Sequence, residues 1–330
     1  MSRFYLVTGG TGFLGSAVVR RLIADGHRVR VLDNNSRGRV ERLRGLEGRV
    51  EFIEGDIRNG DAVRSAVRGV DGVFHLAFIN GTEFFYRRPD LVLDVAVKGM
   101  THVIDACVEA GVKELLLTSS SEVYHSPEQI PTDETVALSI PDCYNPRFAY
   151  AAGKIISEIM AINHGRRHFE RVVIVRPHNV YGPDMGWEHV IPQLVLRMNG
   201  LATHPEDPVP FPVQGTGLQT RSFVYIDDFV DGLALALERG EHLGIYHVGT
   251  TEELTIAEVA RAIGDFFGRR IRIVPGDPAA GGVLRRCPDI TKIARLGYRP
   301  KVRLRDALPR VAQWYVDNAD RAPEHKGILV

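Results

Sequence analysis

The amino-acid sequence predicts an α/β protein with a doubly wound parallel sheet and a smaller C-terminal lobe. In the first half of the chain, short apolar segments rich in β-branched residues alternate with segments of helical periodicity. This alternation is typical of parallel strands joined by right-handed helical crossovers. The strand-like segments are apolar along almost their whole length, as expected for strands that helices cover on both faces.

The predicted elements follow one another in a regular order. Strands are expected at residues 3–8, 28–32, 49–53, 72–76, 114–118 and 171–176. Helices are expected at residues 13–25, 89–110 and 148–164, and the last is predicted to end at Gly165. Farther along, proline and glycine become frequent, and helical segments recur at residues 227–238, 256–267 and 304–317.

This change of pattern divides the chain into two predicted domains. Residues 1–177 are expected to carry the sheet, and residues 178–330 are expected to form most of the smaller lobe. The division is not clean, because residues 223–226 and 245–248 look like strands that rejoin the main sheet.

Composition excludes several classes of protein. Lys and Arg together number 41, as do Asp and Glu, so the chain lacks the basic excess of a nucleic-acid-binding protein. The cysteines, Cys107, Cys143 and Cys287, have neither the spacing of a zinc site nor that of a disulfide framework, so no metal site is expected. We find no signal-peptide pattern and no apolar run of about 20 residues that could span a membrane, and therefore expect a soluble, cytoplasmic protein.

A glycine-rich turn follows the first predicted strand. Gly9, Gly12 and Gly15 lie between this strand and the next helix, and the stretch from Gly10 also fits G-x-G-x-x-G. Glycines at these positions permit a tight turn and close approach of a pyrophosphate to the helix N-terminus. The sequence therefore predicts a Rossmann-type, dinucleotide-binding first domain.

The end of the second predicted strand bears on the choice of dinucleotide. Asp33 lies about 20 residues after the glycines, where its carboxylate can accept hydrogen bonds from both ribose hydroxyls of an adenosine. It would repel a 2′-phosphate, so NAD is favoured over NADP. Arg37 and Arg39 lie close by and leave NADP as an alternative, unless they belong to a solvated loop.

Tyr150 and Lys154 are the strongest candidates for catalysis. They lie four residues apart on one face of a predicted helix, downstream of the triplet Ser119 to Ser121. A phenol has a pKa of about 10 and is a weak base, but a nearby ammonium group favours its ionised form. The alternative is an ordinary amphipathic helix with a surface Tyr and Lys.

Taken together, the motifs resemble an extended short-chain dehydrogenase/reductase of the NAD-dependent sugar-nucleotide epimerase/dehydratase family. The matching segments are Thr8–Gly15, Asp33–Asn34, Asp56–Ile57, His75–Ala77, Ser119–Tyr124, Tyr150–Lys154, Arg176–Pro177, Asn179–Pro183, Arg221–Asp228 and Tyr246–Gly249. The match extends over nearly the whole chain. It implies the following cofactor-binding residues: Gly9, Gly12, Phe13, Leu14, Gly15, Asp33, Asn34, Asp56, Ile57, Leu76, Ala77, Tyr150 and Lys154.

The resemblance also implies roles at the reactive site. Ser120, three residues before Val123, corresponds to the catalytic serine or threonine, and Tyr150 to the base that removes a sugar hydroxyl proton. Lys154 also contacts the nicotinamide ribose.

Further residues are implied to bind the nucleotide. Asn179 and Arg221 correspond to residues that hold its pyrophosphate, and either Arg285 or Arg286 adds a second phosphate contact. Val190 lies in the segment that packs along the nucleobase. Some relatives stack an aromatic residue at the position of Gln214, and Phe211 is expected to take over that contact here.

The reaction after oxidation of the sugar is less well defined. We place C4 epimerisation of a nucleotide sugar first, with a UDP-sugar favoured, because it needs only the residues already assigned. The usual 4,6-dehydratases carry Asp-Glu where this chain has Ser121-Glu122. Glu122 keeps a dehydratase or decarboxylase as the alternative, and a non-catalytic NAD-binding sensor or scaffold is a further one. The resemblance also implies a homodimer through the helices near residues 90–110 and 149–165.

Overall fold

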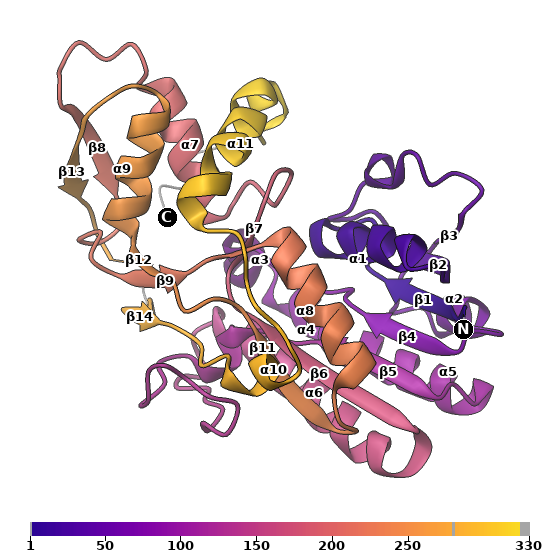
Figure 1. Cartoon of the computed structure of the whole chain (residues 1–330). Helices are drawn as coiled ribbons and strands as arrows, with labels where there is room; N and C mark the ends of the chain where they lie inside the picture. Colours follow the sequence, from indigo (N-terminus) through magenta and orange to yellow (C-terminus); the bar gives the residue numbers. More distant parts are fainter. Residues whose placement is uncertain (1, 279–280, 324–330) are drawn as a thin grey trace.

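The computed structural model describes residues 2–278 and 281–323; the outer limits of the predicted domains, residues 1 and 330, lie outside them. Its centre is a parallel sheet with the strand order β11-β6-β5-β4-β1-β2-β3 (Figure 1). The strands are β1 (Phe4–Thr8), β2 (Arg28–Asp33), β3 (Val50–Glu54), β4 (Gly72–His75), β5 (Glu114–Thr118), β6 (Arg171–Pro177) and β11 (Gly244–Val248). The predicted doubly wound α/β fold is confirmed.

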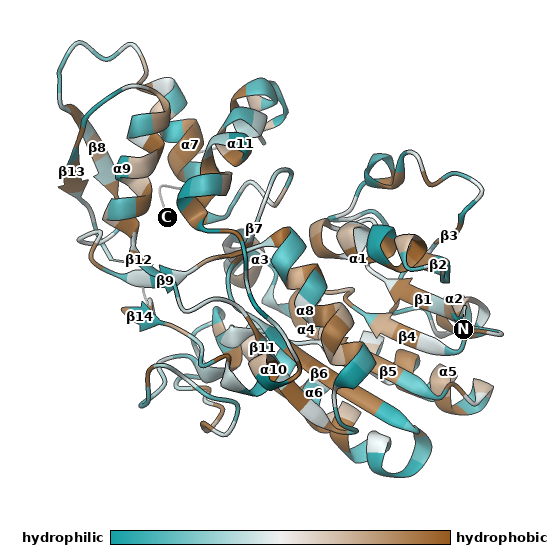
Figure 2. Ribbon diagram, in the orientation of Figure 1, coloured by the Kyte–Doolittle hydropathy of each residue, from teal (hydrophilic) through white to brown (hydrophobic). Residues whose placement is uncertain are grey.

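Helices cover both faces of this sheet. The main ones are α1 (Phe13–Ala24), α2 (Gly60–Val67), α5 (Met100–Ala110), α6 (Phe148–His168) and α8 (Ile226–Arg239). Along β1, Tyr5 and Val7 belong to the core under α1 and α8, whereas Phe4 and Leu6 belong to the core under α2, α5 and α6. Burial on both faces explains why the inner strands β1, β4, β5 and β6 are largely hydrophobic, whereas the edge strand β3 is not buried (Figure 2).

The second lobe lies beyond the carboxyl ends of the strands (Figure 1). Its helices are α7 (Val190–Gly200), α9 (Ile256–Phe266), α10 (Thr291–Arg295) and α11 (Leu304–Asp317), of which α10 packs against β11 of the main sheet. Its strands form small sheets: β8 (Val209–Val213) with β13 (Ile271–Pro275), and β9 (Thr220–Ser222) between β12 (Glu253–Thr255) and β14 (Arg285–Arg286).

Two expectations about the elements need correction. Residues 223–226 do not rejoin the main sheet: β10 (Val224–Tyr225) pairs with β7 (Val180–Tyr181) instead. Helix α6 passes through Gly165 and ends at His168.

The helix expected at 89–110 is present without a break. It consists of α4 (Pro89–Asp94), a π-helical turn (Val95–Gly99) and α5, and a short helix, α3 (Thr82–Arg87), precedes it. Such turns are frequent at functional sites, and Val95 does line the cavity described below.

A buried ion pair joins α6 to strand β6 of the sheet. Arg176 of β6 donates hydrogen bonds of 2.9 and 2.6 Å to the two carboxylate oxygens of Glu158. Ser119 donates to the same carboxylate, and Arg176 also donates to the Tyr124 hydroxyl. Because both charged side chains are almost completely buried, each depends on the other for compensation.

We expect Glu158→Gln to destabilise the fold strongly, because it leaves the Arg176 guanidinium buried without a counter-charge. The loss should be about 3–5 kcal/mol of unfolding free energy in urea denaturation. The matched control is Glu170→Gln, which breaks an exposed pair with Lys113 and should cost about 0–1 kcal/mol. Equal losses in the two variants would contradict the importance assigned to the buried pair.

Candidate active site

A cavity of about 440 Å³ opens at the carboxyl ends of the parallel strands. It lies where the strand order reverses, with β1 and β2 leading one way and β4 and β5 the other, which is the usual ligand position in such sheets. All residues predicted to bind the cofactor line it: Gly9, Gly12, Phe13, Leu14, Gly15, Asp33, Asn34, Asp56, Ile57, Leu76, Ala77, Tyr150 and Lys154. The candidate catalytic residues Ser120 and Glu122 line it as well.

The glycine-rich turn forms a cradle with no space for side chains. Gly9 has a φ of +75°, and a Cβ atom there would lie 2.7 Å from the backbone nitrogen of Ala77. At Gly15 a Cβ atom would lie 2.0 Å from the carbonyl oxygen of Gly9. The N-terminus of α1 is thus open to a diphosphate at close range, and this geometry fits a dinucleotide.

The carboxylate of Asp33, at the end of β2, is held by backbone amides at the cavity wall. The Asp33 carboxylate accepts hydrogen bonds from the backbone amides of Thr11 (3.0 Å) and Asn35 (2.9 Å), which fix its orientation. A carboxylate has further lone pairs, so it can still accept from ribose hydroxyls. Asn34 donates to Asp56 over 3.0 Å and connects the ends of β2 and β3 along the same wall.

Tyr150 lies in a largely apolar environment. Its ring meets Phe78 edge-on at 5.1 Å and lies 5.0 Å from the ring of Phe85. Burial raises the pKa of the Tyr150 phenol, and a hydrogen bond with the Ser120 side chain opposes this rise. The Ser120 hydroxyl in turn accepts from the amide of Glu122 over 3.1 Å, so the turn after β5 holds it in place.

Lys154 is completely enclosed one helical turn beyond Tyr150. Its ammonium group donates to the Thr118 carbonyl over 2.7 Å and lies 3.8 Å from the centroid of the Phe78 ring. The Tyr150 ring centroid is 5.8 Å away. Burial lowers the pKa of Lys154 to about 7, although the Glu158 carboxylate acts in the opposite direction. The charged and neutral forms of the lysine are therefore both populated near neutral pH.

Glu122 faces the same cavity as one half of an ion pair. Arg286 donates to its carboxylate over 2.6 Å. Burial alone would raise the pKa of Glu122, but the charge and hydrogen bond of Arg286, with the charges of Arg147 and Arg221, bring it to about 2. Glu122 is consequently ionised at neutral pH and is a weak base.

The structure brings only some of the predicted substrate residues to this cavity. Asn179 and Val190 line it. Phe211 does not: its side chain is completely buried in the core of the lobe and could reach a nucleobase only after repacking. Arg285 is exposed and pairs with Glu253 over 2.8 Å, so the cavity-lining arginine of the pair is Arg286.

Arg221 lies behind the cavity wall. Its guanidinium donates to the carbonyls of Thr220 and Val283, over 2.7 and 2.8 Å. Burial and the neighbouring charge of Arg286 lower the pKa of Arg221 to about 10. These two hydrogen bonds use only part of the five N–H donors of the guanidinium group, and they fix its orientation.

Sequence reasoning missed several residues of the cavity. Arg147 lies three residues before Tyr150, at the N-terminus of α6, and the helical spacing could have identified it. Phe85 gave no local signal, because it reaches Tyr150 from a different helix. Arg42 lines the cavity near Asp33 and belongs to the cluster of arginines after β2.

Residues 2–278 and 281–323 contain neither a metal-binding cluster nor a membrane-spanning helix. Within these ranges, no group of His, Cys, Asp and Glu is arranged to hold a metal ion. The same part of the chain contains no helix with the length and hydrophobicity of a membrane span.

The fold and the cavity define a dinucleotide-dependent enzyme of the Rossmann class, with a serine, a tyrosine and a lysine lining the cavity. Residues 5–249 match the NAD dependent epimerase/dehydratase family, and the chain belongs to this family. Its cofactor is NAD. The family resemblance carried by the sequence motifs is thereby confirmed.

Similar proteins of known identity catalyse several different reactions. The chain is 32% identical to UDP-glucuronic acid decarboxylase 1 of Arabidopsis thaliana, over 98% of this chain and 72% of that protein. A dTDP-glucose 4,6-dehydratase of Streptomyces venezuelae, solved with NAD, is 32% identical with a TM-score of 0.85, over 97% of this chain and 99% of that one. UDP-glucose 4-epimerase of Thermotoga maritima, solved with UDP-glucose, is 27% identical with a TM-score of 0.84, over 96% and 99%.

The buried Lys154 should make folding depend on pH. In the NAD-free protein its pKa of about 7 lies below the ordinary value of 10.5, so between these values the unfolded state binds more protons than the folded state. This contribution makes wild-type stability rise with pH across the window. We therefore expect the unfolding free energy of Lys154→Met, relative to that of wild type, to be highest below pH 7. This difference should decrease as the pH rises toward 10, because wild type gains stability across that window.

Urea denaturation at several pH values measures this difference. Lys113→Met is the matched control, since Lys113 is exposed and should show no comparable pH-dependent difference. A Lys154→Met difference that stays constant from pH 6.5 to 9.5 would show that Lys154 has an ordinary pKa.

Proposed function

We propose that this protein oxidises C4 of a nucleotide sugar and that Tyr150 is the base that removes the hydroxyl proton. The observation that carries this proposal is the meeting of Ser120, Tyr150 and Lys154 at one end of the dinucleotide cavity. Bound NAD supplies the hydride acceptor. Ser120 is placed to hydrogen-bond the same sugar oxygen, and Lys154 to contact the nicotinamide ribose and to take up or release a proton near neutral pH.

The environment of Glu122 limits what can follow oxidation. A dehydratase must remove the C5 proton with a base, and the candidate carboxylate, Glu122, is engaged in an ion pair with Arg286 in this structure. The neighbouring residue, Ser121, is buried and has no carboxyl group. It therefore cannot act as the carboxylic acid that protonates a leaving hydroxyl. We therefore place dehydration last among the reactions of the family.

Decarboxylation of a UDP-uronic acid agrees best with this site. Once C4 is a ketone, the sugar is a β-keto acid and can lose CO₂ without a protein base. The C5–C6 bond breaks, its electron pair forms the C4–C5 enolate, and a proton from solvent or a protein acid then adds at C5. Return of the hydride to C4 reduces the ketone, which leaves a UDP-pentose and regenerates the oxidised cofactor. Arg286 and Arg147 provide positive charge for an anionic substrate, and relatives that are UDP-glucuronic acid decarboxylases match over almost the whole chain.

C4 epimerisation of a UDP-sugar is the second candidate. It requires only Ser120, Tyr150 and Lys154, with Glu122 as a structural partner of Arg286. The likeness to the UDP-glucose 4-epimerase structure favours it. In that reaction the keto sugar rotates in the cavity and regains hydrogen at C4 from the opposite face.

Binding and assembly complete the proposal. Asn179 and Arg286 would hold the nucleotide diphosphate, and Val190 would pack along the base.

We also propose that the protein is a cytoplasmic homodimer. The dimer is supported by Ile156 and Ile159, which expose apolar surface on α6, one of the two long helices expected at the interface. Size-exclusion chromatography with light scattering would reveal a monomer if the dimer is incorrect.

Tyr150→Phe should reduce turnover at least about 100-fold, because it removes the proton-accepting group and leaves the ring packing intact. Bound NAD, measured by absorbance after denaturation, should be unchanged. Tyr144→Phe is the matched control, since Tyr144 is almost fully exposed and outside the cavity. Substantial activity in Tyr150→Phe would refute the proposed base.

Incubation with UDP-glucuronic acid in D₂O distinguishes the candidate reactions. Decarboxylation predicts equal amounts of CO₂ and a UDP-pentose that carries one deuterium at C5, because the enolate takes its proton from solvent. NMR of the products measures both. Interconversion of UDP-glucose and UDP-galactose without deuterium incorporation would establish epimerisation instead, and no reaction with any nucleotide sugar would favour a non-catalytic NAD-binding protein.

A further inference from the structure

Three arginines follow the end of β2, where the adenosine ribose is expected. Arg37, Arg39 and Arg42 lie within ten residues of Asp33, and Arg37 and Arg42 line the cavity beside it. An arginine in this region is the feature that accommodates the 2′-phosphate of NADP in Rossmann domains, because its planar fork matches phosphate oxygens. From composition alone, this loop therefore looks suited to NADP, in conflict with Asp33.

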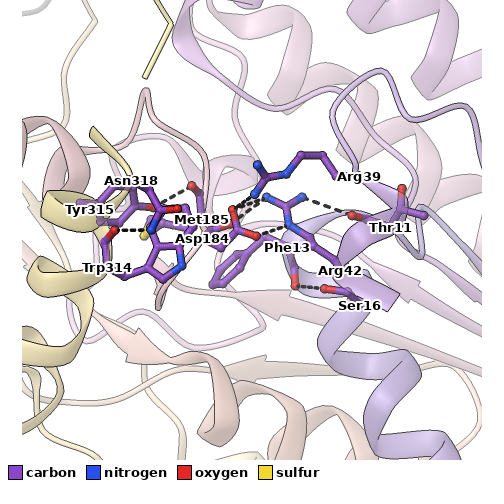
Figure 3. A network of polar contacts seen from close by, with 10 residues as sticks. All are labelled: Thr11, Phe13, Ser16, Arg39, Arg42, Asp184, Met185, Trp314, Tyr315 and Asn318. Atoms are coloured by element: carbon purple, nitrogen blue, oxygen red, sulfur yellow. Dashed lines mark hydrogen bonds and ion pairs between the residues drawn. The ribbon is translucent and has the colours of Figure 1, made fainter. Parts of the chain in front are cut away.

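The conflict is resolved by carboxylates from a distant segment. Arg37 donates two hydrogen bonds of 3.2 Å to Glu188, in the segment between β7 and α7. In the same segment, Asp184 accepts from Arg42 Nε over 2.8 Å and also from Arg39. Figure 3 shows both Arg39 and Arg42 directed at the Asp184 carboxylate. Each of the three guanidinium groups thus has a carboxylate partner.

This acidic segment is itself held in place by the C-terminal lobe. The Tyr315 hydroxyl of α11 donates to the Met185 carbonyl over 2.7 Å. The ring of Trp187 meets the Tyr315 ring edge-on at 5.1 Å. Asp184 has a φ of +61°, a left-handed conformation that is uncommon outside glycine. The position of the two carboxylates is therefore set by the fold and does not depend on the arginines alone.

The arginine loop is also fastened to the glycine-rich turn. The Arg39 amide and the Arg42 guanidinium both donate to the Thr11 carbonyl, over 3.1 and 3.2 Å. The Thr11 amide donates to Asp33. The arginines are thereby fixed close to the ribose-binding carboxylate, but with their charges directed toward the opposite side of the cleft.

We propose that Glu188 and Asp184 determine the preference for NAD over NADP, acting from the lobe across the cleft. They engage the guanidinium groups that would otherwise bind a 2′-phosphate, and they add negative charge next to that position. Asp33 then excludes the phosphate from its own side. This inference concerns the cofactor alone and is independent of the sugar reaction.

The test compares the nucleotides that the full-length protein retains. Wild type and Glu188→Gln are equilibrated by dialysis with defined mixtures of NAD and NADP, and the bound nucleotides are quantified by chromatography. Removing the carboxylate charge and freeing Arg37 should raise the NADP-to-NAD binding ratio roughly tenfold. Adding Arg37→Met to Glu188→Gln should abolish most of that gain, because the freed guanidinium is what binds the phosphate.

Two further variants make the outcome decisive. Asp207→Asn breaks an exposed ion pair with Arg270 in the lobe and should leave the ratio unchanged. Asp184→Asn frees Arg39 and Arg42 and should shift the ratio in the same direction as Glu188→Gln, which keeps the test available if one variant fails to fold. An unchanged ratio in a folded carboxylate variant would overturn the proposal, as would a gain that persists without Arg37.

Discussion

The site depends on the buried ion pair between Glu158 and Arg176. Glu158 lies on α6, one turn beyond Lys154 and two turns beyond Tyr150, so one helix face carries both the reactive groups and their anchor. Arg176 reaches from β6 to the Tyr124 hydroxyl, at the end of the short helix that begins after Ser120. A single pair of charges therefore fixes the distance between the serine and the tyrosine, which come from separate parts of the chain.

Further hydrogen bonds complete this network, so that its buried polar groups do not destabilise the fold by lacking partners. The Tyr124 hydroxyl contacts His247 Nε2 at 2.6 Å, and His247 Nδ1 lies 3.1 Å from the Asp289 carbonyl. Burial lowers the pKa of His247 to about 4, so the ring is neutral and can accept at Nε2 while it donates at Nδ1. A fully satisfied network of this kind is rigid, and it holds α6, the helix that carries Lys154, against the sheet.

Much of the fold and the cofactor site could be predicted from the sequence, because their signals are local. The glycines of the turn lie within one short segment, Gly9 to Gly15, and Asp33 lies about 20 residues after them. Long-range pairing gave no such signal. Arg285 and Arg286 are adjacent on the short strand β14, so their side chains point to opposite sides, and only its register against β9 decides that Arg286 faces the cavity. The burial of Phe211 likewise depends on how the lobe packs.

The distribution of arginines shows how a chain with no net charge can still recognise anions selectively. At the adenosine end of the cavity, the cationic side chains Arg37, Arg39 and Arg42 are matched by Asp184 and Glu188. At the substrate end, Glu122 partners only Arg286, whose Nε and Nη2 atoms have no hydrogen-bond partner among the described residues, and Arg147 and Arg221 add to the positive potential. Positive charge thus remains uncompensated where a nucleotide sugar would place its phosphates. It is neutralised at the other end of the cavity, where an additional phosphate would change the cofactor.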